Sequence, residues 1–552
     1  MKTNIKFISL FKLFKDNIIQ EAMISLDNSI ELLALYRKLG WRIVRTIFTS
    51  KEKTQTRMRT MYMFFQFVLQ LRKANGSTYV VQYLKLSQLA IQKCIAGEKL
   101  ASMRQLEPTL SFPRLSNSGL PSIIPLRDRR AIMNRSVPII RFWLTLFSVY
   151  RIVNVPGNLK LNTITDPYSG SVVALGRVSD NLRALARKYS SRFPKAVARK
   201  DLGISLIESS SPSSPVSWVT LFETPLALAK AGLGQHFLDY MDEMGYSRLL
   251  KTWIVSFKHF KIIDKFIPFH DTPCVGPIGK AMKNVKIGKL SKKAEAAGKI
   301  RIFAMVDVWT QSLLKPLHLA LFEFLKSLPN DGTFDQNASW KRCAVKAKVS
   351  GRSFGYDLSA ATDRLPIQLQ VAVLESFIGP RAAKLWKCIL VDRDYYLNEG
   401  SKDKGGERVS TPYRYAVGQP MGALSSWAML AVTHHLLVQL AYRQARPYGL
   451  DSTWYENYEI IGDDVNIFDE DVATSYLGLM AEIGVPINLS KSVVSTNPTT
   501  EFAKVTTHYG SNVSALSWKM FVSQNTLMGR VSILWSLLNK EYLPLSHLGT
   551  WL

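Results

Sequence analysis

The clearest pattern of apolar and polar positions lies in the C-terminal half of the chain. Two runs rich in β-branched and aromatic residues, 458–461 and 465–468, flank a Gly-Asp-Asp motif at 462–464. Because Gly accepts the backbone angles of a tight turn, this pattern predicts a β-hairpin with two Asp residues at its tip. A third run, 353–357, predicts a short strand that ends at a carboxylate.

Helical patterns follow these strands. Pro366 suits the first turn of a helix that we expect to continue over 367–377. An apolar face predicts a second helix over 428–441, and a third helix is expected over 471–483. The segment 485–492 then predicts a short strand that carries Lys491 near its end.

The N-terminal part of the chain has a helical periodicity. Its first two hundred residues are basic, rich in Leu, Ile and Phe, and predicted to be mostly helical. The Ser- and Pro-rich run 209–215 predicts a loop or internal boundary, and 215–250 predicts further helix. From 280 to 292 every third residue is Lys, and Gly residues punctuate the stretch, so loops and strands fit it as well as a helix does. This basic stretch is either a solvated face or a channel wall for phosphates.

The composition points to a partner. The 552 residues are 47% hydrophobic, which supports a large core and argues against disorder. Lys and Arg number 71 against 42 Asp and Glu, a formal charge of +29. Such an excess favours a polyanionic partner, with nucleic acid first and an anionic membrane surface second.

The cysteines and the apolar runs argue against several other classes of protein. The four cysteines lie far apart and form no C-x-x-C pair, so neither a zinc site nor a disulfide framework is predicted. The apolar run 138–153 is too short and too charged to span a bilayer. The basic segment 1–19 fits a surface helix better than a transit peptide, and no secretion signal is visible.

Asp357, Asp463 and Asp464 are the candidate catalytic residues. Two adjacent carboxylates at a hairpin tip repel one another, which costs free energy without a counter-ion. Three carboxylates from two strands can hold two Mg²⁺ ions about 3.5–4 Å apart, the arrangement used for in-line phosphoryl transfer. The sequence therefore predicts a two-metal site, in which Mn²⁺ could replace Mg²⁺.

Three further features concern the surroundings of that site. The segment 418–427 is rich in Gly, Pro and small hydroxyl residues, and it predicts a flexible loop that a ligand approaches closely. His434 and His435 are adjacent on the predicted helix and do not share a face, so no metal site is expected there. Lys491 is a candidate proton donor to departing pyrophosphate.

The order of these motifs resembles that of the RNA-dependent RNA polymerases of mitoviruses, capsidless positive-strand RNA viruses that replicate in mitochondria. The matching segments are 297–307, 331–336, 357–364, 418–427, 462–464, 488–492 and 501–504. The resemblance implies an α+β right-hand polymerase with an antiparallel palm sheet. It places a helical N-terminal fingers extension at 1–210, fingers at 211–350, the palm at 351–500 and a short thumb at 501–552.

The resemblance also implies roles for individual residues. Asp357 and Asp464 would be the principal metal ligands, with Asp463 in support and Lys491 as the proton donor. Asp363 would select ribonucleotides through the sugar 2′-hydroxyl. The residues implied to bind the nucleotide are Lys299 and Arg301 at the triphosphate, and Gly422, Ser425 and Ser426 near the ribose. The implied partners are a single-stranded RNA template, nascent RNA and rNTPs, with the protein a monomer in the host mitochondrion.

Two departures and three rival interpretations stay open. Many positive-strand polymerases carry Asn just after the Gly-rich loop, where this chain has Ala-Met-Leu at 428–430, and little chain follows Asp464 to build a thumb.

A reverse transcriptase usually has an aromatic residue and Ala in place of Ile461-Gly462, and it excludes ribose. A non-catalytic RNA-packaging protein explains the charge but not three carboxylates. A degenerate copy without activity would not need the intact Asp residues.

Overall fold

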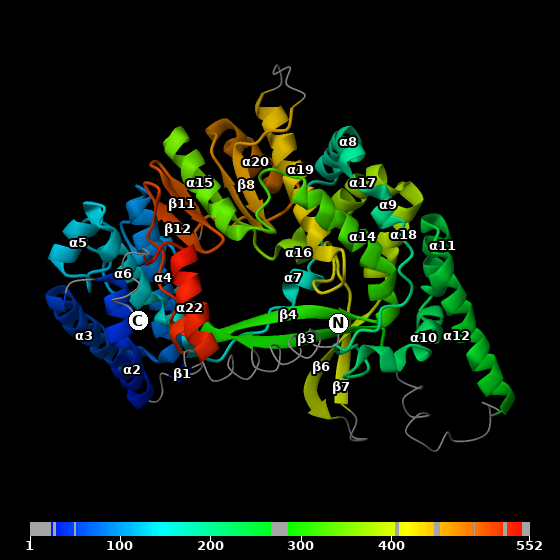
Figure 1. Ribbon diagram of the computed structural model, residues 1–552, viewed down its shortest axis with the longest axis horizontal. Helices are drawn as coiled ribbons and strands as arrows, with labels where there is room; N and C mark the ends of the chain where they lie inside the picture. Colours follow the sequence, from blue (N-terminus) through cyan, green and yellow to red (C-terminus); the bar gives the residue numbers. More distant parts are fainter. Residues whose placement is uncertain are drawn as a thin grey trace.

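The computed structural model describes residues 24–25, 29–48, 51–266, 285–402, 408–446, 453–490, 492–522 and 527–543. Over these residues the protein has the mixed α+β structure that the family resemblance implies, with many helices and small, mostly antiparallel sheets. Figure 1 shows a helical body at each side, a sheet region between them at the top, and a long β-hairpin that runs beneath.

The N-terminal helical body is built from α2 Ser29–Ile47, α3 Lys51–Asn75, α4 Ser77–Ile95, α5 Leu126–Met133 and α6 Val137–Phe147, with 3₁₀ turns η1 Met103–Gln105 and η2 Ser148–Ile152. A two-stranded parallel sheet pairs β1 Ile24–Ser25 with β2 Val153–Asn154. The C-terminal helices α21 Trp518–Val522 and α22 Leu527–Asn539 share its apolar core. Trp518 donates its indole N–H to the Thr145 carbonyl at 2.7 Å, which fixes the start of α21 to α6.

The second helical body covers the other side of the molecule (Figure 1). Its elements are α7 Asn162–Thr165, α8 Val172–Tyr189, η3 Ser190–Arg192, α9 Lys195–Ala198, η4 Ser217–Thr220, α10 Glu223–Lys230, α11 Gly234–Met244, α12 Ser247–Phe266, α14 Val308–Lys326, α16 Ala361–Arg364, α17 Ile367–Ile378 and α18 Pro380–Val391. These helices confirm the predicted helical stretch 215–250 and the helix after Pro366. The chain passes from the apolar core of the N-terminal body to that of the second body between residues 155 and 164. This transition comes well before the Ser-rich loop near residue 210.

A four-stranded antiparallel sheet, the central sheet, lies between the two bodies. Its strand order is β10 Val493–Ser495, β5 Ser353–Asp357, β9 Asp464–Ile467 and β8 Tyr458–Ile461. The helices packed around it include α15 Gln336–Ser350, α19 Ser426–Ala445 and α20 Glu470–Glu482. A neighbouring sheet joins β11 Thr499–Phe502, β12 Val505–His508 and β13 Ser511–Asn512. The predicted hairpin, strand and three helices are therefore confirmed to within a few residues at each end.

A second four-stranded sheet has the order β4 Lys299–Val306, β3 Gly288–Glu295, β6 Tyr395–Lys402 and β7 Arg408–Tyr413. The Lys-rich stretch is a strand from Gly288 onward, and its earlier lysines Lys280 and Lys283 lie outside the described residues. The tip of the β3–β4 hairpin, η5 Ala296–Gly298, packs against the N-terminal body. A Cβ at Gly157 would lie 2.4 Å from the Gly298 carbonyl oxygen, so the hairpin tip and the body approach at backbone distance.

One predicted element is absent from the structure, and another lies outside the described residues. The segment 485–490 has no strand: Ile487 makes a single bridge to Leu358, and strand β10 starts only at Val493. Pro486 has no N–H to donate to a ladder, which disfavours a strand there. The predicted helix at 1–19 lies outside the described residues. Among the residues that are described, no helix is both long and apolar enough to cross a membrane.

Candidate active site at the central sheet

The strand register brings the two main candidate carboxylates together. Asp357 ends β5 and Asp464 begins β9, and the two are directly paired across the antiparallel ladder. Residues opposed in this way have Cβ atoms about 4.5–5.5 Å apart and share a face of the sheet. Asp463 precedes Asp464 in the turn and is exposed. The three predicted carboxylates therefore stand at one end of the central sheet.

The turn that carries Asp463 depends on Gly462. Its φ of +62° is a left-handed conformation that side-chain-bearing residues adopt at a cost. A Cβ at this position would also lie 2.9 Å from Nε1 of Trp427. Any larger residue would have to displace that indole, so Gly462 fixes both the shape of the turn and the position of the carboxylates beside it.

Asp464 has an unusual acidity. Burial, first of all, and then the nearby charges of Glu501, Asp463 and Asp357 raise its pKa from the usual 3.8 to about 8, while Lys504 opposes the shift. Glu501 on β11 is a partly exposed residue whose carboxyl also has a raised pKa, chiefly because of desolvation. The sequence placed Glu501 in a matching segment but gave it no role, and its proximity to the Asp cluster follows only from β11 packing beside β9 and β5.

The residues fit a hard divalent cation in their chemistry. Carboxylate oxygens are the ligands that Mg²⁺ takes in proteins, and the repulsion that raises the pKa of Asp464 is what a cation would relieve. Within the described part of the chain, no three His, Cys, Asp or Glu side chains are already arranged as a coordination site.

A buried charge cluster braces the hairpin from behind. Glu459 on β8 is fully buried. Its carboxylate accepts a bidentate pair from Arg342, at 2.8 and 2.7 Å, and further hydrogen bonds from Lys346 at 2.9 Å and Ser339 at 2.7 Å. All three partners belong to α15, so a fully desolvated carboxylate locks this helix to β8 with its hydrogen bonds satisfied.

His434 holds the turn directly. Its Nδ1 lies 2.8 Å from the Gly462 carbonyl oxygen and its Nε2 lies 2.8 Å from the Tyr476 hydroxyl. Burial lowers the pKa of His434 to about 4, so the ring is neutral near pH 7. Since a carbonyl only accepts, Nδ1 carries the proton and Nε2 accepts from Tyr476. The next residue, His435, bonds Tyr458 and Asp331 instead, so the two histidines anchor different parts of the sheet.

Replacing His434 with Ala should disturb the turn at Gly462 more than it unfolds the protein. The change leaves the Gly462 carbonyl without its partner, and loss of a buried hydrogen bond costs about 1–3 kcal/mol. For the nucleotide incorporation that the family resemblance implies, we expect roughly tenfold lower kcat, with a fall in Tm of a few degrees in thermal unfolding. Tyr476→Phe removes only the outer hydrogen bond and serves as the matched control. An equal loss of kcat in both variants would mean that the bond to Gly462 has no special importance.

The Gly-rich loop is pinned rather than flexible, contrary to the sequence expectation. Met421 accepts a backbone hydrogen bond from Ala304 of β4 at 2.6 Å. The amide of Gln311 donates to the Gly422 carbonyl at 3.1 Å and accepts from the Leu424 N–H at 2.8 Å. These bonds tie the loop to β4 and to α14, which compensates for the entropy of its small residues.

The two candidate serines of this loop lie inside the protein. Ser425 is fully buried, and its hydroxyl accepts a hydrogen bond from the Trp386 indole at 2.9 Å. Its backbone N–H donates to Nδ1 of His318 at 3.1 Å. Ser425 therefore helps to hold the loop in place through both its hydroxyl and its backbone N–H. The hydroxyl of Ser426 is buried and has no hydrogen-bond partner among the described residues.

The basic candidates lie on the β3–β4 hairpin. Lys299 and Arg301 are both exposed, and Lys293 pairs directly with Arg301 across the ladder. Arg301 forms an ion pair with Glu295 at 2.7 Å, and exposed pairs of this kind contribute little to stability. The hairpin thus presents several cations on one face, which suits phosphate binding. Lys491 lies outside the described residues.

Asp363 lies on α16, in the segment after Asp357. Its carboxylate accepts a hydrogen bond of 2.8 Å from the Thr163 hydroxyl on α7. Burial raises the pKa of Asp363 to about 6, although the bond from Thr163 and the charge of Arg364 both lower it. Sequence reasoning did not single out Thr163, because two hundred residues separate it from Asp363 and no motif surrounds it.

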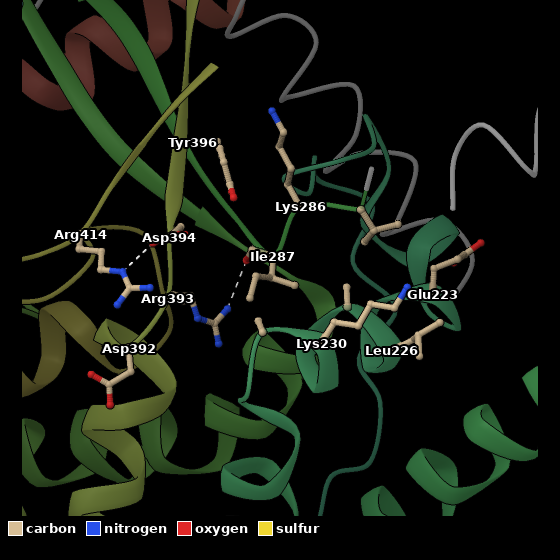
Figure 2. Close-up of a pocket in the computed structure, with 13 residues that line it drawn as sticks. Glu223, Leu226, Lys230, Lys286, Ile287, Asp392, Arg393, Asp394, Tyr396 and Arg414 are labelled. Atoms are coloured by element: carbon tan, nitrogen blue, oxygen red, sulfur yellow. Dashed lines mark hydrogen bonds and ion pairs between the residues drawn. The ribbon is translucent and has the colours of Figure 1, made fainter. Parts of the chain in front are cut away.

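A separate cavity of about 470 Å³ lies where α10 meets the start of β3 and β6 (Figure 2). None of the predicted site residues lines it. Two of its arginines already form ion pairs. Arg414 pairs with Asp394 at 2.6 Å, and the buried Arg393 pairs with Asp307 at 2.8 Å. Figure 2 shows these side chains pointing in different directions, so they do not define a ligand by converging on it.

Comparisons with known proteins agree with the motif order. A model of the family described as mitovirus RNA-dependent RNA polymerase matches residues 197–549. The chain is 32% identical over 442 residues to the RNA-directed RNA polymerase of Cryphonectria parasitica mitovirus 1, an alignment that covers 78% of this chain and 50% of that protein. Two uncharacterised mitochondrial proteins of Arabidopsis thaliana are 36% and 29% identical over 33% and 31% of this chain, and these alignments cover 68% and 78% of the two plant proteins. The chain therefore belongs to the mitovirus RNA-dependent RNA polymerase family.

Proposed function

We propose that this protein is an RNA-directed RNA polymerase that copies a viral RNA genome from rNTPs in the host mitochondrion. The observation that carries the proposal is the pairing of Asp357 with Asp464 across β5 and β9, beside Asp463, in a chain of this family. The chain spans half the length of its viral relative, so this activity is inferred for the chain and not read from the relative. The formal charge of +29 fits an RNA template and product.

The family's right-hand architecture can be assigned to the observed elements. We place the palm at the central sheet and the fingers at the β3–β4 hairpin with its neighbouring helices. The short thumb would be formed by the described C-terminal helices. Because α21 and α22 share one core with the N-terminal body, that body would pack as one unit with the thumb.

Asp357, Asp463 and Asp464 would hold the Mg²⁺ ions. When bound, the ions lower the pKa of the attacking 3′-hydroxyl and neutralise charge on the triphosphate and on the departing pyrophosphate. Lys299 and Arg301 on the hairpin add positive charge along the phosphates. Asp363 recognises the sugar 2′-hydroxyl, and Lys491 donates a proton to pyrophosphate. Gly422 lets the backbone of the loop approach the ligand closely, and Ser426 supplies a hydroxyl there.

The test of this proposal separates an RNA polymerase from a reverse transcriptase and from a protein without synthetic activity. Purified protein is supplied with a single-stranded RNA of known sequence, Mg²⁺, and either rNTPs or dNTPs. The proposal predicts a complementary RNA product that requires both template and Mg²⁺, with little DNA made. Preferred use of dNTPs would indicate a reverse transcriptase, and RNA binding without any synthesis would indicate a packaging protein or a degenerate copy.

A further inference from the structure

The segment 162–167 of the N-terminal half is built into the site that contains Asp363. Arg364, which is buried, donates to the carbonyl oxygens of Asp166 at 2.7 Å and Pro167 at 2.9 Å. On the other side, the Ala416 N–H donates to the Ile164 carbonyl at 3.0 Å. Three backbone carbonyls of one short segment are thus held by residues of the candidate active-site region. Figure 1 shows α7 beside α16, between the central region and the β3–β4 hairpin.

The Gly-rich loop fixes α16 from another direction. The Gly418 N–H donates to the Asp363 carbonyl at 2.9 Å, and the Gln419 N–H donates to the Thr362 carbonyl at 3.0 Å. A Cβ at Gly418 would lie 2.2 Å from the Thr362 carbonyl oxygen, so only Gly allows this approach. The backbone of Asp363 is therefore immobilised, and the remaining freedom of its carboxylate is the rotation of the side chain.

Thr163 removes that freedom. Its hydroxyl donates to one carboxylate oxygen of Asp363 at 2.8 Å, and both side chains are partly buried. A carboxylate has about four acceptor sites, so one bond from Thr163 leaves capacity for a sugar hydroxyl. A donor of this kind also favours the charged form, which is the form that accepts from a 2′-hydroxyl.

We propose that Thr163 is a positioning residue for ribose selection, which holds the Asp363 carboxylate in the orientation that recognises the 2′-hydroxyl of the incoming nucleotide. The proposal rests on the proposed polymerase function and adds to it a residue from outside the seven motifs. It assigns the Thr163 hydroxyl a role in substrate specificity, whereas the backbone of the clamped segment 162–167 serves packing.

The test compares CTP with 2′-deoxy-CTP on one RNA template, using the full chain and measuring kcat/KM for each. Thr163→Val keeps the shape of the side chain and removes the hydroxyl, and we expect the CTP to dCTP preference to fall about tenfold, mainly through slower use of CTP. Thr163→Ser restores the hydroxyl and should restore the preference. Thr165→Val is the matched control, since Thr165 is exposed on the same α7 and its hydroxyl bonds only the Leu161 carbonyl within its own segment.

The pH profile gives a second measurement that needs no variant. The charged and titratable groups facing Asp363 are Arg364 on its own helix and Tyr415 after β7. With a pKa of about 6, the Asp363 carboxylate is protonated as the pH falls below 6, so the wild-type preference for CTP should decline there. Loss of the Thr163 hydroxyl raises that pKa, so the decline should begin at a higher pH in Thr163→Val.

The outcomes distinguish a failure of the proposed role of Thr163 from a failure of the proposed polymerase function. A wild-type preference retained in Thr163→Val, or a preference that does not change between pH 5 and 8 in the wild type, overturns the role of Thr163 while leaving the polymerase intact. Equal losses in Thr163→Val and Thr165→Val would mean that general disturbance of α7 is responsible, which also overturns it. No incorporation of either nucleotide by the wild type overturns the proposed function, and the inference with it.

Discussion

Asp464→Asn is expected to lose at least about a thousandfold in Mg²⁺-dependent nucleotide incorporation and, at the same time, to stabilise the metal-free protein. The loss follows because Asn removes a charged ligand at the position where the ions neutralise the reacting phosphates, an effect worth several kcal/mol. The gain in stability follows from the pKa of Asp464, which burial and the neighbouring acidic side chains raise to about 8.

The raised pKa of Asp464 makes the stability of the metal-free protein depend on pH. The Asp464 carboxyl has a pKa of about 8 in the folded protein, whereas its ordinary pKa is 3.8. It therefore binds its proton more tightly in the folded state. The metal-free wild type should therefore lose stability as the pH rises from about 4 to 8, by up to roughly 1.4 kcal/mol per pH unit. Asn carries no charge, so Asp464→Asn should lose much less over the same range.

Chemical unfolding at pH 5 and pH 8, with and without Mg²⁺, measures both effects. Mg²⁺ should stabilise the wild type more at pH 8 than at pH 5 and should have little effect on Asp464→Asn. A mutant that is inactive but no more stable than the wild type at pH 8 would show that Asp464 is not a desolvated, repelled carboxylate.

The second large effect is expected from Gly422→Ala. Gly422 has a φ of +125°, and an added Cβ would lie 2.2 Å from the Ala304 carbonyl oxygen of β4. Neither backbone can yield without breaking the bond between Ala304 and Met421 that ties the loop to β4. Strained backbone of this kind costs about 1–3 kcal/mol per residue. We expect about a hundredfold lower kcat/KM for rNTPs, because the loop shifts away from β4.

Gly176→Ala is the matched control for this substitution. Gly176 lies on the exposed side of α8, and a Cβ there would meet no atom within 4 Å. Ala favours a helix over Gly by up to about 1 kcal/mol, so the control should be as active as the wild type and slightly more stable. Full activity of Gly422→Ala in steady-state incorporation assays would contradict the close approach of the loop to β4.

The local elements of the fold could be predicted because each has its own pattern. The Gly-Asp-Asp hairpin, the strand ending at Asp357 and the helix after Pro366 all follow from turn residues and periodicity within about ten residues. The division into two cores could not be predicted this way. It depends on Trp518 and α21 packing against α6, nearly four hundred residues earlier, and no local signal encodes such a pairing.

In the candidate site, too, the residues within local motifs could be predicted, whereas those held by contacts between distant segments could not. Sequence reasoning named Asp357, Asp463 and Asp464, and the structure brings them together at one end of a sheet. It missed the groups that surround them: Glu501 beside Asp464, His434 behind Gly462, and Thr163 on Asp363. Each of these acts through a tertiary contact between distant segments. Ser425 was expected near a ligand as a hydroxyl in a Gly-rich loop, and its hydrogen bond from the buried Trp386 is a further tertiary contact that no local pattern encodes.

The central claim is that carboxylates from β5 and from the β8–β9 hairpin form one catalytic centre. The most direct test measures Mg²⁺-dependent, template-directed incorporation of labelled rNTPs by the wild type, Asp357→Asn, Asp464→Asn and the double variant. Residues that act as a unit are not additive, so each single variant should already reduce product to background and the double variant should be no worse. Product from Asp357→Asn at the wild-type level would contradict the claim, because the two strands would then not share one centre.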